Sequence, residues 1–478
     1  MRIVFFALFV LLLAACSPAG PPAFSIKEAK AHSTAAWQNQ VPQMLARINP
    51  PKLASPVFDI TIFGAKPDST FDSRPAIARA IDVCHRAGGG RVLLPPGYWF
   101  SKGPLHLQSG VELHLAAGAT LAFSDVAEDY LPLVKVRWEG TVCWNYSPLI
   151  YAFQQQNIAI TGKGAIDGRG ADWSRAWRKQ QKPDKQRLRQ MGNDTLPEQQ
   201  RVFGNGFLDR DGDGQDDGFG DGKPHFLRPT LIELYECRNI LIEEVTLRNS
   251  PFWTVHPVFS KNITIRGLQI FGGYLNDDGI DPDSCEDVLI EDCYVSTEDD
   301  AISIKAGRDQ DAWHRGKSKN IIVRNCRLNS GVNAFCIGSE MSGGVENIFV
   351  QDCQILSGKH ALNFKCNLDR GGQVQQIFMK NIQVDTIEKA LFIFRMDYHG
   401  YRGNNFPTRF NDFYAHNIRC KQVKGGAFKV VGVEAEPITR LALWDIEVQN
   451  AALESQLAFV EELVVEAVQI SGAPFFPQ

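Results

Sequence analysis

Asn262-Ile263-Thr264-Ile265-Arg266-Gly267-Leu268-Gln269-Ile270 opens on a turn residue and alternates apolar with polar side chains, and Asn276-Asp277-Asp278-Gly279-Ile280 follows it. A second copy begins Asp287-Val288-Leu289-Ile290-Glu291-Asp292-Cys293-Tyr294-Val295 and is followed by Glu298-Asp299-Asp300-Ala301-Ile302. Alternation with period two is the signature of a half-buried β-strand. Each copy therefore predicts a turn, a strand, an acidic step and a second strand.

The nine-residue strand pattern recurs along the second half of the chain, with loops of unequal length between its copies. Its first positions, 22 to 36 residues apart, are Asn239, Asn262, Asp287, Asn320, Asn347, Gln376, Asp412, Arg440 and Glu462. A fixed strand pattern with variable loops is typical of a solenoid. We therefore predict an all-β chain that forms a right-handed parallel β-helix. A β-propeller, the alternative, needs longer blades linked by hairpins.

The seventh position of the repeat is apolar in every copy. Its residues are Val245, Leu268, Cys293, Cys326, Cys353, Ile382, Ile418, Ile446 and Val468. Residues at one register of successive coils stack about 4.8 Å apart. The three cysteines are therefore expected inside the stack as small apolar side chains, although this spacing also permits a disulfide between two of them.

The chain begins with a processing signal. Arg2 precedes an apolar run, residues 3–15, that is too short for an ordinary spanning helix and is typical of a signal peptide. Its end, Leu13-Ala14-Ala15-Cys16, resembles the bacterial lipoprotein cleavage signal, which implies lipidation of Cys16. An ordinary secretory signal with a chance cysteine is the alternative. With Ser17 next, the resemblance implies an outer-membrane lipoprotein of the bacterial cell envelope, facing the periplasm or the surface, with residues 16–55 as lipid attachment and tether.

Residues 56–478 are predicted to form one β-helix domain. Phe58-Asp59-Ile60-Thr61-Ile62 is expected to form the first strand, and Asp72 or Ser73 before Pro75 predicts the start of a helix whose apolar face would cap the exposed end of the core. The net charge of −4 and the isoelectric point near 6.2 give no support for nucleic-acid binding.

A polar excursion, about residues 172–228, interrupts this domain, and its first half is rich in Lys and Arg. Within it Asp209, Asp211, Asp213 and Asp217 alternate with other residues, including glycines, as in loops that present oxygen ligands to Ca²⁺. Gly220 stands where an EF-hand places its last Glu, so a complete EF-hand is not expected. A structural Ca²⁺ site and a solvated acidic loop both fit this stretch. An excursion this long can close one end of a cleft, which would favour cleavage from chain ends.

Acidic residues gather at one register of the second strands. When these strands are aligned on their apolar residues, the position two earlier holds Asp278, Asp300, Asn333 and His360, with Asp299 one step outside the column. Carboxylates on adjacent coils repel one another unless one holds a proton or a ligand uses them. The alternative is a series of acidic turns that simply face water. Repetition of the acids at one register makes this alternative weaker.

These motifs resemble the polygalacturonase family, glycoside hydrolase family 28, in its bacterial branch. Besides the acidic steps, the resemblance is carried by Asn249-Ser250-Pro251-Phe252-Trp253-Thr254-Val255-His256-Pro257, Gly338-Ser339-Glu340-Met341-Ser342-Gly343-Gly344 and Arg370-Gly371-Gly372. It implies hydrolysis, with inversion, of uronic-acid-containing polysaccharides such as pectin. Asp299 would protonate the glycosidic oxygen, and Asp278 and Asp300 would activate water. Inverting enzymes usually hold their two carboxyl groups about 6.5–9.5 Å apart.

Two of the implied substrate-binding positions depart from the family pattern. The full expected set is Asn276, Asn333, Lys305, His360, Asn363 and Lys365. Lys305 and Lys365 share one register and would present ammonium groups to a uronate carboxylate. The family's His is Asn333 here, and its carboxylate-binding Arg is Asn363. Because an amide is neither acid nor base and carries no charge, His360, one rung from Asn333, is a candidate to substitute in part. An ordinary histidine at the edge of the strand is the equal alternative.

The sequence thus predicts a monomeric glycoside hydrolase for an acidic polysaccharide or oligosaccharide. It would require no cofactor, hold at most a structural Ca²⁺, contact membrane only through its lipid anchor and bind no nucleic acid. A polysaccharide lyase of the same fold, using Ca²⁺ and a basic side chain, is one alternative. A non-catalytic glycan-binding β-helix is another, favoured by Asn333 and Asn363 but opposed by the retention of three aspartates.

Overall fold

Turn residues in the left-handed region begin the repeated strands and make the chain coil. The computed structural model describes residues 24–477, and all nine first positions of the predicted repeat have φ between 53° and 64°. Asn and Asp adopt this region more readily than other non-glycine residues. Their side chains also bond between coils: Asn262 Nδ2 donates to Asn239 Oδ1 at 2.7 Å, and Asn347 Nδ2 donates to Asn320 Oδ1 at 2.7 Å.

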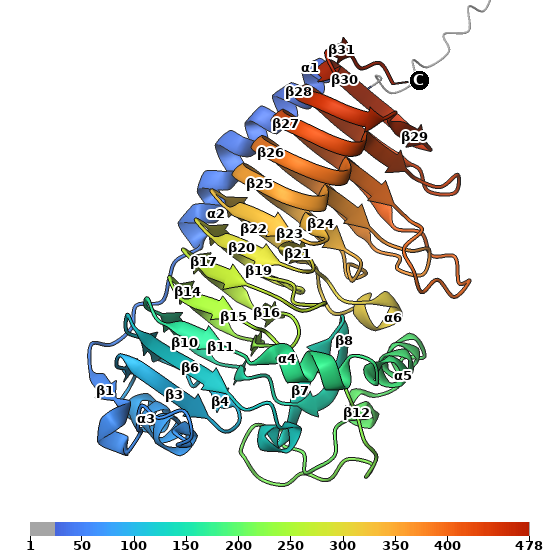
Figure 1. Ribbon diagram of the computed structural model, residues 1–478. Helices are drawn as coiled ribbons and strands as arrows, with labels where there is room; N and C mark the ends of the chain where they lie inside the picture. Colours follow the sequence, from blue (N-terminus) through green and yellow to red (C-terminus); the bar gives the residue numbers. More distant parts are fainter. Residues whose placement is uncertain (1–23, 478) are drawn as a thin grey trace, which may run out of the picture.

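The strands that follow these turns form one long parallel sheet along the coil (Figure 1). Its members are β1 (Val57–Asp59), β2 (Gly90–Leu94), β5 (Val111–Leu115), β10 (Gln156–Thr161), β14 (Arg238–Glu243), β17 (Lys261–Arg266), β19 (Glu286–Glu291), β22 (Ser318–Arg324), β25 (Val345–Lys365), β26 (Gln373–Arg395), β27 (Arg409–Val431), β28 (Ile438–Leu453) and β30 (Val460–Ile470). From β25 to β28 each strand is long enough to continue onto the neighbouring faces. The predicted right-handed parallel β-helix is confirmed.

Two further faces complete each coil. One contains β3 (Gly97–Ser101), β6 (Ala119–Phe123), β11 (Ala165–Asp167), β15 (Thr246–Arg248), β18 (Gln269–Phe271), β20 (Tyr294–Thr297) and β23 (Arg327–Ser330). The other, which carries the acidic column, contains β4 (Leu105–His106), β9 (Ile150–Phe153), β13 (Ile232–Tyr235), β16 (Val255–Val258), β21 (Ile302–Ile304), β24 (Asn333–Gly338) and β29 (Gln456–Ala458). A short antiparallel strand, β31 (Ala473–Pro474), ends the coil on β30.

The interior of the coil is a stack of apolar side chains. The seventh-position residues of the repeat are buried, including Cys293, Cys326 and Cys353. All three are free thiols, so they occupy the stack as small apolar groups and no disulfide joins them.

The N-terminal end of the coil is covered by a helix, as predicted. Helix α3 (Arg74–Arg86) follows Ser73 and buries Ile77, Ile81 and Cys84 against the first strands. The first strand is shorter than predicted, because β1 ends at Asp59, whose side chain accepts the Thr61 N–H and begins a 3₁₀ turn, Ile60–Phe63. The cap shields apolar side chains of the first coil that would otherwise face water.

The expected tether is wrong for its described part, because residues 26–47 are helical. Helix α1 (Ile26–Ala35), a π-helical turn (Ala36–Gln40) and α2 (Val41–Arg47) run along the outside of the coil (Figure 1). Trp37 and Met44 pack on an apolar strip that includes Phe349 and Phe378. Burial of this strip holds the segment down, and helical propensity contributes less. Cys16, the signal segment and residues 17–23 lie outside the described residues.

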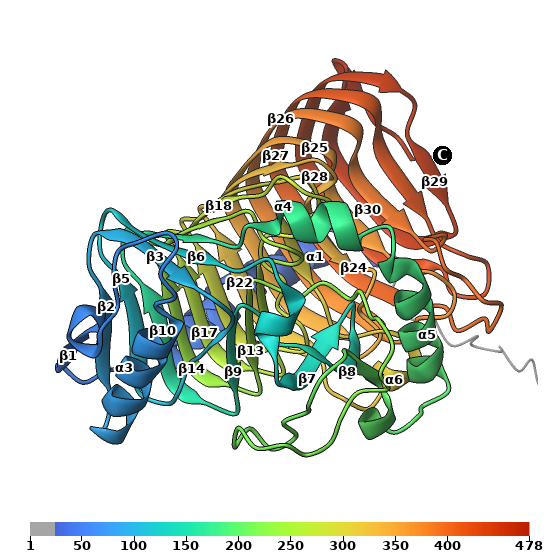
Figure 2. The ribbon, with the colours of Figure 1, turned by 60° about the horizontal axis from the view of Figure 1, so that its bottom comes forward.

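The excursion about residues 172–228 contains helices as well as loops. The sequence had predicted only a long loop insertion here. It includes α4 (Gly170–Asp172), a π-helical turn (Trp173–Trp177), α5 (Gln181–Asn193), a 3₁₀ turn (Glu198–Gln200) and β12 (Val202–Phe203). Strand β12 extends an antiparallel hairpin of β7 (Leu133–Trp138) and β8 (Thr141–Tyr146). Figure 2 shows α5 and this hairpin together on one side of the coil, with α6 (Asp309–Ala312) beside them.

The acidic loop of the excursion brings some of its predicted ligands together. Asp209, Asp211 and Asp217 each place one carboxylate oxygen within 4.8 Å of the others, while Asp213 is not in this group. Asp209 already accepts backbone N–H bonds from Gly212 and Gly214, at 2.8 and 3.1 Å. Calcium binding by this loop stays a prediction.

Among residues 24–477 no helix is both long and apolar enough to cross a membrane.

Candidate active site

Stacking of the coils builds the predicted column of polar residues. The backbone N–H of Gly279 donates to Asp300 O, and that of Ala301 donates to Asn333 O, at 2.9 and 2.8 Å. Asn333 in turn pairs with His360 on the next coil. These parallel ladder bonds place Asp278, Asp300, Asn333 and His360 at one register, so residues far apart in the sequence lie on one face of the coil.

Three aspartates meet at this column. Asp278, Asp299 and Asp300 each place one carboxylate oxygen within 4.8 Å of the others, and all three line a cleft of about 630 Å³. Asp278 and Asp300 are buried, and Asp299 is partly exposed to the cleft. This contact is closer than the spacing of about 6.5–9.5 Å that is usual for inverting enzymes and that the sequence-based mechanism anticipated.

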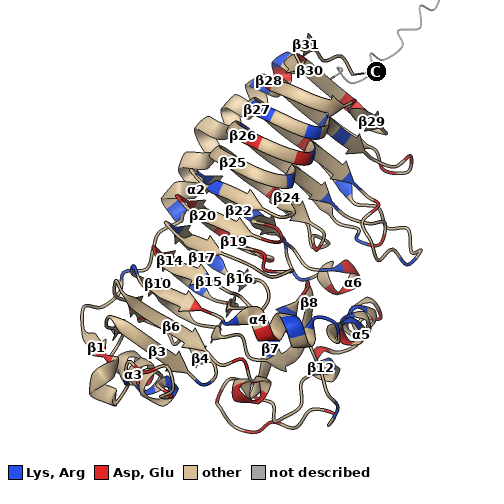
Figure 3. Ribbon diagram, in the orientation of Figure 1, with Lys and Arg blue, Asp and Glu red and all other residues tan. Residues whose placement is uncertain are grey.

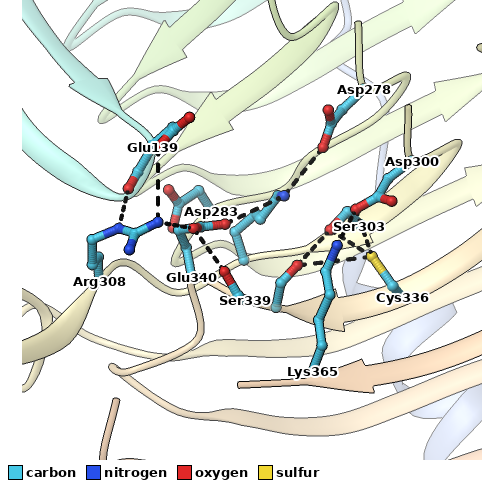
Figure 4. A network of polar contacts seen from close by, with 12 residues as sticks. Glu139, Asp278, Asp283, Asp300, Ser303, Arg308, Cys336, Ser339, Glu340 and Lys365 are labelled. Carbon is cyan, nitrogen blue, oxygen red and sulfur yellow. Dashed lines mark hydrogen bonds and ion pairs between the residues drawn. The ribbon is translucent and has the colours of Figure 1, made fainter. Parts of the chain in front are cut away.

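The two lysines that share one register bind the aspartates directly. Lys305 and Lys365 occupy the same register, with Gly338 between them. Lys305 Nζ lies 3.2 Å from Asp278 Oδ2, and Lys365 Nζ lies 2.7 Å from Asp300 Oδ2 (Figure 4). Both lysines are buried. Each ammonium is paired with a carboxylate of the protein itself, without any substrate in the cleft.

Amide groups hold Asp300 from its other side. Asn333 Nδ2 donates to Asp300 Oδ1, and Asn333 Oδ1 accepts from Asn363 Nδ2 at 2.8 Å. His360 Nδ1 lies 2.8 Å from the same Asn333 oxygen, so this ring nitrogen carries the hydrogen. Burial, followed by the Lys389 charge, lowers the pKa of His360 to about 4, which keeps the ring neutral. Asn333, Asn363 and His360 therefore act on Asp300 as one hydrogen-bonded group.

Asn276 holds Asp299. Its backbone N–H donates to Asp299 Oδ2 at 3.1 Å, and its own side-chain oxygen accepts from Arg228 Nη2 at 2.8 Å. The backbone N–H of Asp300 donates to the other Asp299 oxygen at 3.0 Å. Asn276 lines the cleft, as expected of a substrate-binding residue, and its backbone N–H orients the Asp299 carboxylate.

The environment drives the three carboxyl pKa values apart. Burial raises the pKa of Asp299 to about 6, and the neighbouring Asp300 charge adds to this effect. Burial and the adjacent Asp281 raise the pKa of Asp278 well above its usual range, although Lys305 opposes the shift. For Asp300, burial is outweighed by Lys365 and Lys305, so its pKa falls below the ordinary value. Asp300 is thus the carboxylate that is ionised at mildly acidic pH.

Several residues of the site had no clear signal in the sequence. The Cys336 thiol contacts Asp300 Oδ2 at 3.1 Å and Ser303 Oγ at 2.9 Å. Asp281 is fully buried with both oxygens lacking a hydrogen-bond partner among the described residues, and burial raises its pKa to about 8. Asp281 follows Ile280 directly and lies outside the aligned acidic column, so nothing in the sequence marked it as part of the site.

A chain of ion pairs joins the aspartates to the excursion. Lys305 Nζ lies 3.6 Å from Glu340, Glu340 binds Arg308, and Arg308 lies 3.8 Å from Glu139 (Figure 4). Glu139 lies in the β7–β8 turn and pairs with Arg189 of α5 at 2.6 Å. The position of α5 is therefore tied through alternating charges to the face that carries the three aspartates.

The fold and the acidic cleft define the class: a right-handed parallel β-helix enzyme with clustered carboxyl groups on one face. Residues 179–464 match the family model "Glycosyl hydrolases family 28". The chain belongs to this family and is a glycoside hydrolase.

Individual relatives agree with this assignment. The chain is 28% identical to a probable polygalacturonase from Vitis vinifera, covering 76% of this chain and 68% of the relative. It is 28% identical to an exo-poly-alpha-D-galacturonosidase from Dickeya chrysanthemi, covering 80% and 65%, so it spans about two thirds of the length of these relatives. The crystal structure of a hyperthermoactive exopolygalacturonase from Thermotoga maritima is 32% identical, covers 92% of this chain and 97% of its own, and superposes with a TM-score of 0.84.

Proposed function

We propose that this protein hydrolyses galacturonide bonds in pectin-like polysaccharide or its oligosaccharides, starting from a chain end. The observation that carries the proposal is the set of three aspartates with separated pKa values in one cleft. The similarity to two proteins named as exo-acting galacturonan hydrolases supports the substrate and the mode of attack. The cleft supports the same mode of attack. It is lined by α5 and the Tyr398–Gly400 loop, and long segments beside a cleft can close one of its ends.

In the proposed mechanism Asp299 is the general acid. Its raised pKa leaves a proton on the carboxyl group for transfer to the glycosidic oxygen. Asp300, ionised and bound to Lys365, takes the proton from the attacking water, and Asp278 holds that water from the neighbouring coil. We propose inversion from the family resemblance. The close approach of the carboxyl groups, taken alone, would favour a covalent intermediate.

Product analysis tests the proposal. Polygalacturonate should yield saturated monomer from the first minutes, with little early loss of viscosity. Proton NMR should show the new anomeric centre first in the configuration opposite to that of the cleaved bond. Ultraviolet-absorbing unsaturated uronates would identify a lyase instead, and binding without any turnover across a panel of uronate glycans would identify a binding protein.

The pH dependence of kcat/KM should follow the two shifted carboxyl groups. Because Asp299 must be protonated, kcat/KM should fall about tenfold per pH unit above pH 6, where its pKa lies. The acidic limb reports ionisation of Asp300, whose pKa is lowered by Lys365. Lys365→Met should therefore move the acidic limb to higher pH, and the alkaline limb should move in the same direction, because Lys365 also lowers the pKa of Asp299. Movement of the alkaline limb alone would contradict this assignment.

The sequence also led us to propose a lipid anchor at Cys16 and a structural Ca²⁺ in the Asp209–Asp217 loop. The first rests on the cleavage-signal resemblance. The second is supported by the approach of Asp209, Asp211 and Asp217 to within 4.8 Å. Neither enters the catalytic mechanism.

A further inference from the structure

The coil itself leaves few cations free to meet a uronate carboxylate. Lys305 and Lys365 are buried and paired with Asp278 and Asp300. Arg308 is buried between Glu340 and Glu139. Asn363, at the position where the family resemblance implies an arginine, is neutral. An acidic sugar that enters the cleft therefore needs another source of positive charge.

The excursion supplies a row of cations over the cleft. Lys182, Lys185 and Arg189 are spaced by three and four residues within α5, which places them on one side of that helix, and Arg178 lies in the turn just before it. All four line the same cleft as the three aspartates. Figure 3 shows lysine and arginine positions along α5, the helix that contains three of them.

The row divides into a paired half and an unpaired half. Glu139 binds Lys185 at 3.6 Å and Arg189 at 2.6 Å, so these two side chains serve to anchor α5. Arg178 and Lys182 are exposed to the cleft and form no ion pair or side-chain hydrogen bond with any of residues 24–477. Only the unpaired half has charge to offer a ligand.

The unpaired half lies on the side of the general acid. Gln181, between Arg178 and Lys182, accepts a hydrogen bond from Arg228 Nε at 3.0 Å. Arg228 Nη2 donates to Asn276, whose backbone N–H holds Asp299. Three consecutive contacts thus fix the first turn of α5, which carries Lys182, relative to the acid, and Arg178 lies three residues before that turn.

We propose that Arg178 and Lys182 bind the carboxylate of an acidic sugar next to the bond that is cleaved, in place of the absent arginine at position 363. The site rests on the proposed function and makes it more specific. The protein then recognises at least two adjacent uronates, one at the aspartates and one beneath the start of α5. A solvated basic surface is the alternative, and the chain offers a matched control in Lys179, which is exposed on the same segment but does not line the cleft.

The site can be tested by calorimetric titration of the Asp299→Asn variant with trigalacturonate. This variant lacks the proposed acid, so binding is measured without turnover. In that background, Arg178→Gln with Lys182→Gln should weaken binding roughly tenfold, because two partly exposed ion pairs are lost. Lys179→Gln should leave the dissociation constant unchanged. A trimer with its carboxyl groups reduced to alcohols should bind the double variant and its parent alike. Affinity should also fall less steeply with added salt in the double variant.

The outcomes separate the two levels of the proposal. If trigalacturonate binds the double variant and the Lys179→Gln protein equally well, the cation site is wrong while the galacturonide substrate stands. If trigalacturonate does not bind even the parent, the proposed substrate itself is wrong. In the active enzyme, the double variant should raise KM for the trimer and leave kcat nearly unchanged, since neither side chain touches the reacting atoms.

Discussion

Asp299→Asn should lower kcat by about 10²–10⁴-fold, which is the usual contribution of a general acid. Asparagine has the same shape as aspartate but cannot deliver a proton to the leaving oxygen. The variant should keep its fold and its affinity for galacturonides. The amide oxygen can still accept the backbone N–H of Asn276 or of Asp300, which Asp299 accepts at 3.1 and 3.0 Å.

Single-turnover kinetics and thermal unfolding of the same preparation measure this effect. Asp292→Asn is a matched control, because Asp292 is exposed at a turn with φ of 57°, where asparagine is equally at ease. Full activity in Asp299→Asn would remove Asp299 from the acid role. Activity lost together with the thermal transition would show only that the fold had failed.

Arg137→Met should destabilise the protein by about 3–5 kcal/mol, because it removes the closer of the two basic partners of the buried Asp283 carboxylate and leaves only His256, at 3.5 Å. Arg137 lies in β7, and its Nη1 contacts Asp283 Oδ1 at 2.9 Å and Ser284 Oγ at 2.8 Å. Both charged side chains are completely buried. The guanidinium also stacks over Phe259 at 4.5 Å, so the ion pair joins the β7–β8 hairpin to the coil.

Urea unfolding, followed separately by tryptophan fluorescence and circular dichroism, measures this loss. The two probes are needed because a solenoid can unfold in parts. Lys424→Met is the matched control: its pair with Glu388, at 2.7 Å, has both side chains about half exposed, and its loss should cost under about 1 kcal/mol. Equal unfolding midpoints for the two variants would contradict the anchoring role of Arg137.

The register of the site could be predicted from the repeat alone. Asp278, Asp300, Asn333 and His360 stand two residues before aligned apolar positions, and coiling places them in one column as expected. Cys293, Cys326 and Cys353 follow the same logic inside the coil. In each case one local pattern determines the position, because a side chain's face follows from its place in the strand.

The partners of these side chains could not be predicted in the same way. Lys305 and Lys365 line the cleft, where they were expected to face a substrate, but their ion pairs with Asp278 and Asp300 had no signal in the sequence. Residues 24–55 were included in the expected tether, whereas Trp37 and Met44 pack on the coil. Both results depend on neighbours that lie far away in the sequence.

The sequence by itself determined the coil, its cap and the column of acids, since period-two alternation and left-handed turn residues act over a few positions. Only the tertiary structure decided how close the three carboxyl groups come, which cations neutralise them and where α5 lies. Those features depend on contacts between different coils, such as Asp300 with Lys365, or between more distant segments, such as Glu139 with Arg308, and no local pattern encodes such contacts.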